Sequence, residues 1–181
     1  MIWFEKGSGS NKKNRCDMET RYYATGNYRA DHRDETAHAM KNGERWAIAR
    51  AAREMAAYIP SNCVLIPIPS HTGNATYTKE LCAMIARETS AEVRDILKGS
   101  KRETLYNLKK QGRRILPQKL GFYVTEQPPT DKRILIIDNV VATGTTATAA
   151  VRAIGGGIVF AYAAATNSKT RNELKRLYPT L

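Results

Sequence analysis

The sequence has little cysteine and no long apolar run, and each shortage excludes a class of protein. Its 181 residues hold three cysteines, which are too few and too irregularly spaced for a disulfide framework or a zinc cluster: Cys16, Cys63 and Cys82. No segment approaches the roughly 20 apolar residues that a membrane-spanning helix needs. Residues 1–6 show no signal-peptide apolar region, so we expect a reducing, cytoplasmic location.

Acidic residues are also scarce. Asp and Glu together number 17 against 29 Lys and Arg, which gives a formal net charge of +12 and a sequence pI near 9.8. Such a charge favours polyanionic partners, namely nucleic acid, an anionic membrane or highly phosphorylated small molecules. The 42% hydrophobic and 25% charged content is ordinary for a globular protein, so extensive disorder is not expected.

Apolar runs of strand length alternate with helical spacing along the chain. Strands are predicted over residues 63–68, 133–137 and 158–164, and helices over residues 44–59, 76–88, 145–154 and 168–177. In the first helix, Trp46, Met55 and Tyr58 are expected in the core. The alternation predicts an α/β fold: a single domain with a mostly parallel twisted sheet flanked by helices. Residues 1–20, rich in Lys, Asn, Ser and Gly from residue 5 on, are expected to form a loose lead-in to a domain over residues 21–181.

The loop after the second apolar strand carries the clearest chemistry. Ligands of parallel α/β sheets bind beyond the carboxyl ends of the strands, where this loop begins with Asp138 and Asn139, polar groups that can hold ribose hydroxyls. A helix N-terminus then follows, which offers backbone N–H groups and a partial positive charge to a phosphate. The residues predicted to hold the phosphate are Ala142, Thr143, Gly144, Thr145 and Thr146. The alternative is an ordinary strand–loop–helix junction with a threonine-rich cap.

The segment 134–146 resembles the binding signature for 5-phosphoribosyl-1-pyrophosphate (PRPP) of type I phosphoribosyltransferases: four apolar residues, two acids, apolar residues and Thr-Gly-x-Thr. The resemblance implies a Rossmann-like fold with a small hood, formed by residues 1–45 or the region near Tyr123. It also implies Mg²⁺ bound chiefly through substrate oxygens, with Asp138 as a possible protein ligand. The sequence departs from the signature at Asn139, an amide that replaces the usual second acid and cannot supply negative charge.

The loop after the first apolar strand corresponds, by the same resemblance, to the pyrophosphate-binding loop. Its predicted contacts are Ser70, His71, Thr72 and Gly73, and the alternative for His71 is a solvated loop histidine. Residues 22–29, Arg102, Thr104, Leu108, Arg113 and residues 121–122 further resemble the ComF-like, competence-associated branch of the family, here without its zinc ribbon.

Residues 98–119 form a basic arm with eight basic residues against one acid, Glu103. The arm is predicted to be a flexible lid over the pyrophosphate, with Arg102, Lys109, Lys110 and Arg113 as its contacts. Two alternatives stay open: a solvated basic surface, and a contact with single-stranded DNA.

The resulting prediction is transfer of a 5-phosphoribosyl group from PRPP to a nitrogen acceptor, a nucleobase being favoured, with release of pyrophosphate. Asp138 and Asn139 are the predicted catalytic residues. The alternatives are a PRPP or nucleotide sensor without turnover and an accessory protein for DNA uptake or processing. A homodimer is a further possibility that the resemblance raises.

Overall fold

The central sheet follows from three apolar strands that pair in parallel. The computed structural model describes residues 2–5, 21–113 and 116–165. Within them, strands β3 (Cys63–Pro67), β7 (Arg133–Val141) and β8 (Ile158–Ala164) lie side by side, with β7 in the middle. The pairs Val64–Ile134 and Ile136–Val159 show the register of the two ladders. Because both faces of these strands are covered, most of their side chains are apolar on both sides.

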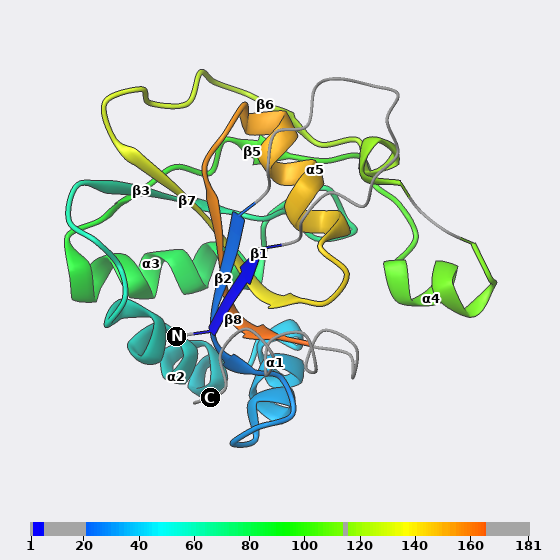
Figure 1. Ribbon diagram of the computed structural model, residues 1–181, viewed down its shortest axis with the longest axis horizontal. Coiled ribbons are helices and arrows are strands. Elements are labelled where there is room, and N and C mark those ends of the chain that lie inside the picture. The colour runs from blue at the N-terminus through cyan, green and yellow to red at the C-terminus, as the bar shows by residue number, and fades with distance from the viewer. Residues whose placement is uncertain (1, 6–20, 114–115, 166–181) are drawn as a thin grey trace.

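Three further strands complete the sheet, in the order β1-β2-β8-β7-β3-β4 (Figure 1). Strand β2 (Arg21–Asn27) pairs in parallel with β8, and β4 (Glu92–Val93) pairs in parallel with β3. Strand β1 (Ile2–Glu5) pairs antiparallel with β2. The structure thus confirms the predicted α/β fold with a mostly parallel sheet. Strands β1 and β2 were not predicted from the sequence, and residues 6–20 of the predicted lead-in lie outside the described residues.

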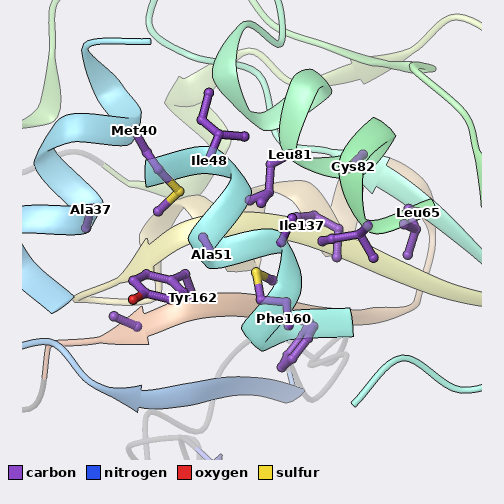
Figure 2. Close-up of a cluster of buried hydrophobic side chains, with 14 of the residues drawn as sticks. Ala37, Met40, Ile48, Ala51, Leu65, Leu81, Cys82, Ile137, Phe160 and Tyr162 are labelled. Carbon is purple, nitrogen blue, oxygen red and sulfur yellow. The ribbon is translucent and has the colours of Figure 1, made fainter. Parts of the chain in front are cut away.

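Helices cover both faces of the sheet. Helices α1 (Arg33–Lys41), α2 (Arg45–Ala56) and α3 (Tyr77–Thr89) bury one face, where Met40, Ile48 and Leu81 meet Ile137 and Tyr162 (Figures 1 and 2). Helix α5 (Thr145–Ile154) buries the other face through small residues such as Ala147 and Ala150. Ile96, Leu97, Phe122 and Val124 also pack on that face. They belong to, or adjoin, the two-stranded sheet of β5 (Leu97–Lys98) and β6 (Tyr123–Val124). Helix α4 (Leu105–Lys110) and the short helix η1 (Pro117–Leu120) lie between β5 and β6 along the chain.

Helix α2 buries only one of the three side chains predicted for its core. Met55 is fully buried, as predicted, but Trp46 is 55% exposed and Tyr58 is 43% exposed, so the prediction of a core position was wrong for both. Trp46 is the second residue of α2, and Tyr58 follows the helix, which ends at Ala56. The buried side of α2 is formed instead by Ala47, Ile48, Ala51, Ala52 and Met55. The terminal helix predicted over residues 168–177 lies outside the described residues. No helix in the described part of the chain is long and apolar enough to cross a membrane.

Candidate functional site

Two loops meet at the carboxyl edge of the sheet. Strands β3 and β7 are parallel neighbours, and the pairing continues past β3 because the Ile68 amide donates to the Ile137 carbonyl at 3.0 Å. Residues 69–76 leave the sheet after β3, and residues 142–144 leave it after β7. This is the position at which open parallel sheets bind ligands, so the two predicted binding loops are neighbours in the fold.

Asp138 lies within β7, not in a loop. The strand continues four residues past its predicted end at Ile137, and Asp138 is 6% exposed there. One of its carboxylate oxygens accepts the Asn139 backbone N–H at 2.7 Å. Burial raises the pKa of Asp138 to about 6, against the opposing effects of the Asn139 and Val140 amides and the Lys41 charge. A carboxyl group whose pKa lies that near neutrality, at the ligand-binding edge of a sheet, marks a candidate functional residue.

Asn139 is buried, 3% exposed, and both ends of its amide are used by the protein. The Tyr77 hydroxyl donates to Oδ1 at 3.2 Å, and Nδ2 donates to the Ala37 carbonyl at 3.3 Å. Because a carbonyl oxygen can only accept, the nitrogen of the amide must face Ala37. An amide at this position therefore satisfies α1 and the start of α3, which a carboxylate could not do.

Tyr77 connects the two loops. It is the first residue of α3, directly after the loop that follows β3, and its hydroxyl reaches the end of β7. Burial and the Asp138 charge raise the pKa of Tyr77, so the hydroxyl stays a donor at physiological pH. The next residue, Thr78, donates from Oγ1 to the Ile68 carbonyl at 2.7 Å and holds the helix start against β3. Tyr77 was not among the residues predicted from the sequence, although its place four residues beyond Gly73 was a usable signal.

The loop after β7 leads into the N-terminus of α5. Ala142 and Thr143 are exposed, and the Thr143 and Thr145 hydroxyl oxygens lie 3.0 Å apart. Gly144 precedes the helix with φ of +75°, a left-handed conformation that favours glycine. The first turn of a helix has N–H groups without intrahelical acceptors, so the geometry is suited to an anion. All five predicted phosphate-binding residues, 142–146, lie at this helix start.

The loop after β3 is a tight turn that is held in place by contacts with Gly99. The Ser70 amide donates to the Asn74 carbonyl at 2.9 Å, and the Ser70 and Thr72 hydroxyl oxygens lie 2.8 Å apart. Gly73 has φ of +95°, and a Cβ there would lie 2.3 Å from the Gly99 carbonyl oxygen. The Gly99 amide donates back to the Gly73 carbonyl at 2.9 Å. His71 and Thr72 remain exposed at the tip of this turn.

The structure divides the predicted lid residues into two groups. Arg102 is joined to the loop after β3: its amide donates to the His71 carbonyl at 2.9 Å and its Nη1 to the Ser70 carbonyl at 3.2 Å. Lys110 and Arg113 are exposed on and after α4, which projects away from the sheet (Figure 1). Lys110 lies over the Tyr106 ring, 4.9 Å from its centre. Lys109 also belongs to α4. Closure of a lid stays a prediction.

The described residues contain no group of three or more His, Cys, Asp or Glu side chains that could hold a metal ion. Asp138 is the carboxylate at the candidate site, which suits a Mg²⁺ ion that keeps its waters and substrate oxygens as main ligands. His38 contacts the Tyr28 hydroxyl, and His32 pairs with Glu35, both on the surface. Cys63 and Cys82 are buried and unpaired, and Cys16 lies outside the described residues.

The comparisons with known proteins give a distant structural likeness. No protein-family model and no curated protein matches the sequence. A solved structure described as the allosteric regulatory enzyme of purine biosynthesis aligns with a TM-score of 0.40 and 15% sequence identity. The alignment covers 71% of this chain and 25% of the other, so this chain spans about a quarter of that protein's length. A likeness this distant says nothing about substrate or activity.

Proposed function

We propose that this protein is a PRPP-binding phosphoribosyltransferase that transfers the 5-phosphoribosyl group to a nitrogen acceptor, with a nucleobase as the favoured acceptor. The observation that carries the proposal is that two loops suited to anions follow neighbouring parallel strands at the carboxyl edge of the sheet, with Asp138 near the end of one of these strands, β7. PRPP has a phosphate at one end, a diphosphate at the other and ribose hydroxyls between, and this order of groups suits the two loops.

In this proposal the 5-phosphate binds at the start of α5, on residues 142–146, and the diphosphate binds at Ser70, His71, Thr72 and Gly73. The ribose hydroxyls face Asp138. Because Asp138 is only 6% exposed, contact with a ribose requires local movement of the groups that cover it. We assign Asn139 a supporting place beside the ribose, since both ends of its amide already have protein partners.

The proposed reaction requires no covalent intermediate between the protein and its substrate. The acceptor nitrogen forms a bond to the anomeric carbon as the bond to the diphosphate oxygen breaks. The diphosphate leaves with the electron pair, and the N–H proton of the acceptor passes to solvent or to the departing diphosphate. Positioning and electrostatic stabilisation supply the rate enhancement. Mg²⁺, when bound with PRPP, would neutralise part of the diphosphate charge, and Asp138 is the protein group that could contribute a ligand. We place the protein in the ComF-like branch on the residues that resemble it.

A second candidate function is PRPP or nucleotide binding without turnover. The observation that favours it is the amide at Asn139, which offers no negative charge to a developing positive charge on the sugar. Both functions share the same binding site, so binding must be measured before turnover.

The test is calorimetric titration of the protein with PRPP, with and without Mg²⁺, on wild type, Asp138→Ala and Thr143→Ala. Thr89→Ala is the matched control, because Thr89 lies at the other end of α3 and donates only to its own helix, to the Ile85 carbonyl at 2.9 Å. We expect saturable binding that the first two substitutions weaken about tenfold or more and the control leaves unchanged. Absence of binding by folded wild-type protein would refute the proposal, and single-stranded DNA would be titrated next. With binding established, PRPP consumption in the presence of each nucleobase separates the enzyme from the sensor.

A further inference from the structure

Two partly buried arginines stack on aromatic rings in this protein, and they differ in what balances their charge. The Arg33 guanidinium lies 4.8 Å from the centre of the Tyr162 ring. Its Nη2 forms an ion pair with Glu54 at 2.8 Å, and its Nη1 donates to the Thr25 hydroxyl at 2.7 Å. Arg33 is therefore a structural cation with its counter-ion built into the fold.

Arg102 has the same aromatic support without the counter-ion. Its guanidinium lies 5.2 Å from the centre of the Phe122 ring, and Nη1 donates to the Ser70 carbonyl. No carboxylate in the described part of the chain forms an ion pair with it. The acid next to it in sequence, Glu103, accepts instead from the Gln111 side chain at 2.9 Å.

The Nε of Arg102 adds a second, independent observation. Among the described residues, it is the buried side-chain nitrogen or oxygen atom that has no hydrogen-bond partner. A buried donor without an acceptor destabilises the fold, and a buried cation without a counter-charge does so further. Consistent with this, burial lowers the pKa of the Arg102 guanidinium. The position is unfavourable for the protein alone and would be relieved by an anion.

The surroundings hold Arg102 in place beside exposed donors. Its backbone amide is bound to the His71 carbonyl, so the side chain and the loop after β3 form one unit. Gly99 leaves room for the stacked pair, since a Cβ there would lie 2.9 Å from the Phe122 ring. The exposed Thr72 hydroxyl and the Ser70 hydroxyl lie on the same loop. A planar guanidinium next to hydroxyl donors is a suitable receptor for phosphate oxygens.

We propose that Arg102 is a preformed receptor for a phosphate or diphosphate anion at the Ser70–Asn74 loop, and that it binds this anion without closure of the α4 arm. The inference rests on the proposed function for its ligand class, the diphosphate of PRPP. It assigns Arg102 to the anion-binding loop after β3, to which it is hydrogen-bonded, and no longer to a lid. An oxyanion seated against the guanidinium supplies the missing counter-charge, and a small shift of the side chain toward it gives Nε–H an acceptor. Lys110 and Arg113 contribute nothing to this binding step.

The test is calorimetric titration with inorganic diphosphate and, separately, inorganic phosphate, on wild type, Arg102→Gln, Arg102→Lys and Phe122→Leu. Arg87→Gln is the charge-matched control, because Arg87 is exposed in the last turn of α3, away from the loops. We expect Arg102→Gln to weaken diphosphate binding on the order of tenfold or more, since charge-assisted hydrogen bonds are about twice as strong as neutral ones. Arg102→Lys should recover only part of the loss, because lysine lacks the planar fork. Phe122→Leu should weaken binding less than Arg102→Gln. Thermal unfolding of each variant shows that the fold is intact.

The outcomes separate this inference from the proposed function. Diphosphate binding that depends on Arg102, in a protein that does not bind PRPP, supports the anion receptor and refutes the phosphoribosyltransferase. PRPP binding that is lost in Thr143→Ala but unchanged in Arg102→Gln supports the proposed function and overturns the inference. Equal losses in Arg102→Gln and Arg87→Gln would show a general charge effect, and failure of folded wild type to bind millimolar diphosphate would also overturn the inference.

Discussion

The amide of Asn139 is expected to be required by the fold, so restoring the usual second acid with Asn139→Asp should destabilise the protein. The present amide donates from Nδ2 to the Ala37 carbonyl at 3.3 Å and accepts from the Tyr77 hydroxyl at 3.2 Å. An ionised carboxyl group at position 139 would place one of its oxygens against the Ala37 carbonyl oxygen, in a site where Asn139 is 3% exposed. It would also set a second carboxyl group next to Asp138.

The magnitude follows from two effects. Loss of the donor removes a buried hydrogen bond to the Ala37 carbonyl and sets two acceptor oxygens against each other, which costs about 1–3 kcal/mol. Burial and the neighbouring Asp138 raise the folded-state pKa of the new carboxyl above its unfolded value of about 3.9. Stability then falls by about 1.4 kcal/mol for each pH unit between the two pKa values, because the folded state holds the proton more tightly. We expect a total loss of about 3 kcal/mol at pH 8, and less at pH 5, where the new carboxyl group can keep its proton and donate it to the Ala37 carbonyl.

The assay is thermal unfolding followed by circular dichroism at pH 5 and pH 8. A loss of about 3 kcal/mol corresponds to a fall in Tm of roughly 6–12 °C for a domain of this size. Asn107→Asp is the control, since Asn107 is exposed on α4 and its substitution should change stability by less than about 0.5 kcal/mol. A variant as stable as wild type at pH 8, or one whose loss is the same at both pH values, would refute the role assigned to the amide. An Asn139→Asp variant that is stable and gains turnover would show that the Asn139 amide has no structural role and that the position only lacks the negative charge of the usual acid.

Three other substitutions test the same site. The folded pKa of Asp138, about 6, lies above the unfolded value of about 3.9, so wild-type stability should fall as pH rises through that window. Asp138→Asn should therefore raise the free energy of unfolding at pH 8 by up to about 3 kcal/mol, seen as a higher Tm, and change it little at pH 4. The same substitution should abolish PRPP binding. Tyr77→Phe should cost about 1–3 kcal/mol in urea unfolding, because it leaves the Asn139 Oδ1 without its donor; an unchanged midpoint would contradict the contact. Gly73→Ala should lower Tm more than Gly43→Ala, since both have positive φ but only Gly73 faces a backbone atom, and equal losses would count against the Gly73–Gly99 contact.

Local sequence signals were sufficient to predict the bounds of an element where helix-breaking glycines and apolar runs agree. Helix α5 and strand β8 have the predicted bounds, because Gly144 and the Gly155–Gly157 run delimit the helix and the apolar run has the length of one strand. The same signals failed for α1, whose buried residues are small apart from Met40 and form a weak apolar stripe. Strand β2 contains Thr25 and Gly26, which reduce its strand signal, and it is stabilised instead by pairing with β8.

The end of β7 shows why polar residues misled the prediction of the site. Asp138 and Asn139 were expected in a loop because they are polar and follow a buried run. Pairing with β8 nevertheless continues through Val141, opposite Ala164, and carries both side chains into the interior. Tertiary pairing thus overrode the local preference of Asp and Asn against strands. Placement at the carboxyl edge of the sheet was predictable from the alternation of strands and helices, whereas burial of the two side chains was not.

The partners of Asn139 could not be predicted from local sequence, and they change the meaning of the substitution. Tyr77 is 62 positions away from Asn139 along the chain, and Ala37 is 102 positions away. Compared with the two-acid signature alone, an amide at this position looks like the loss of a catalytic group. Within the fold, the amide joins β7 to α1 and to the start of α3, whose first residue follows the loop that carries Ser70 and His71. In the proposed function, any loss of negative charge near the ribose therefore comes with contacts that join the two predicted binding loops, and a test of activity should include Asp138 and Arg102 together with Asn139.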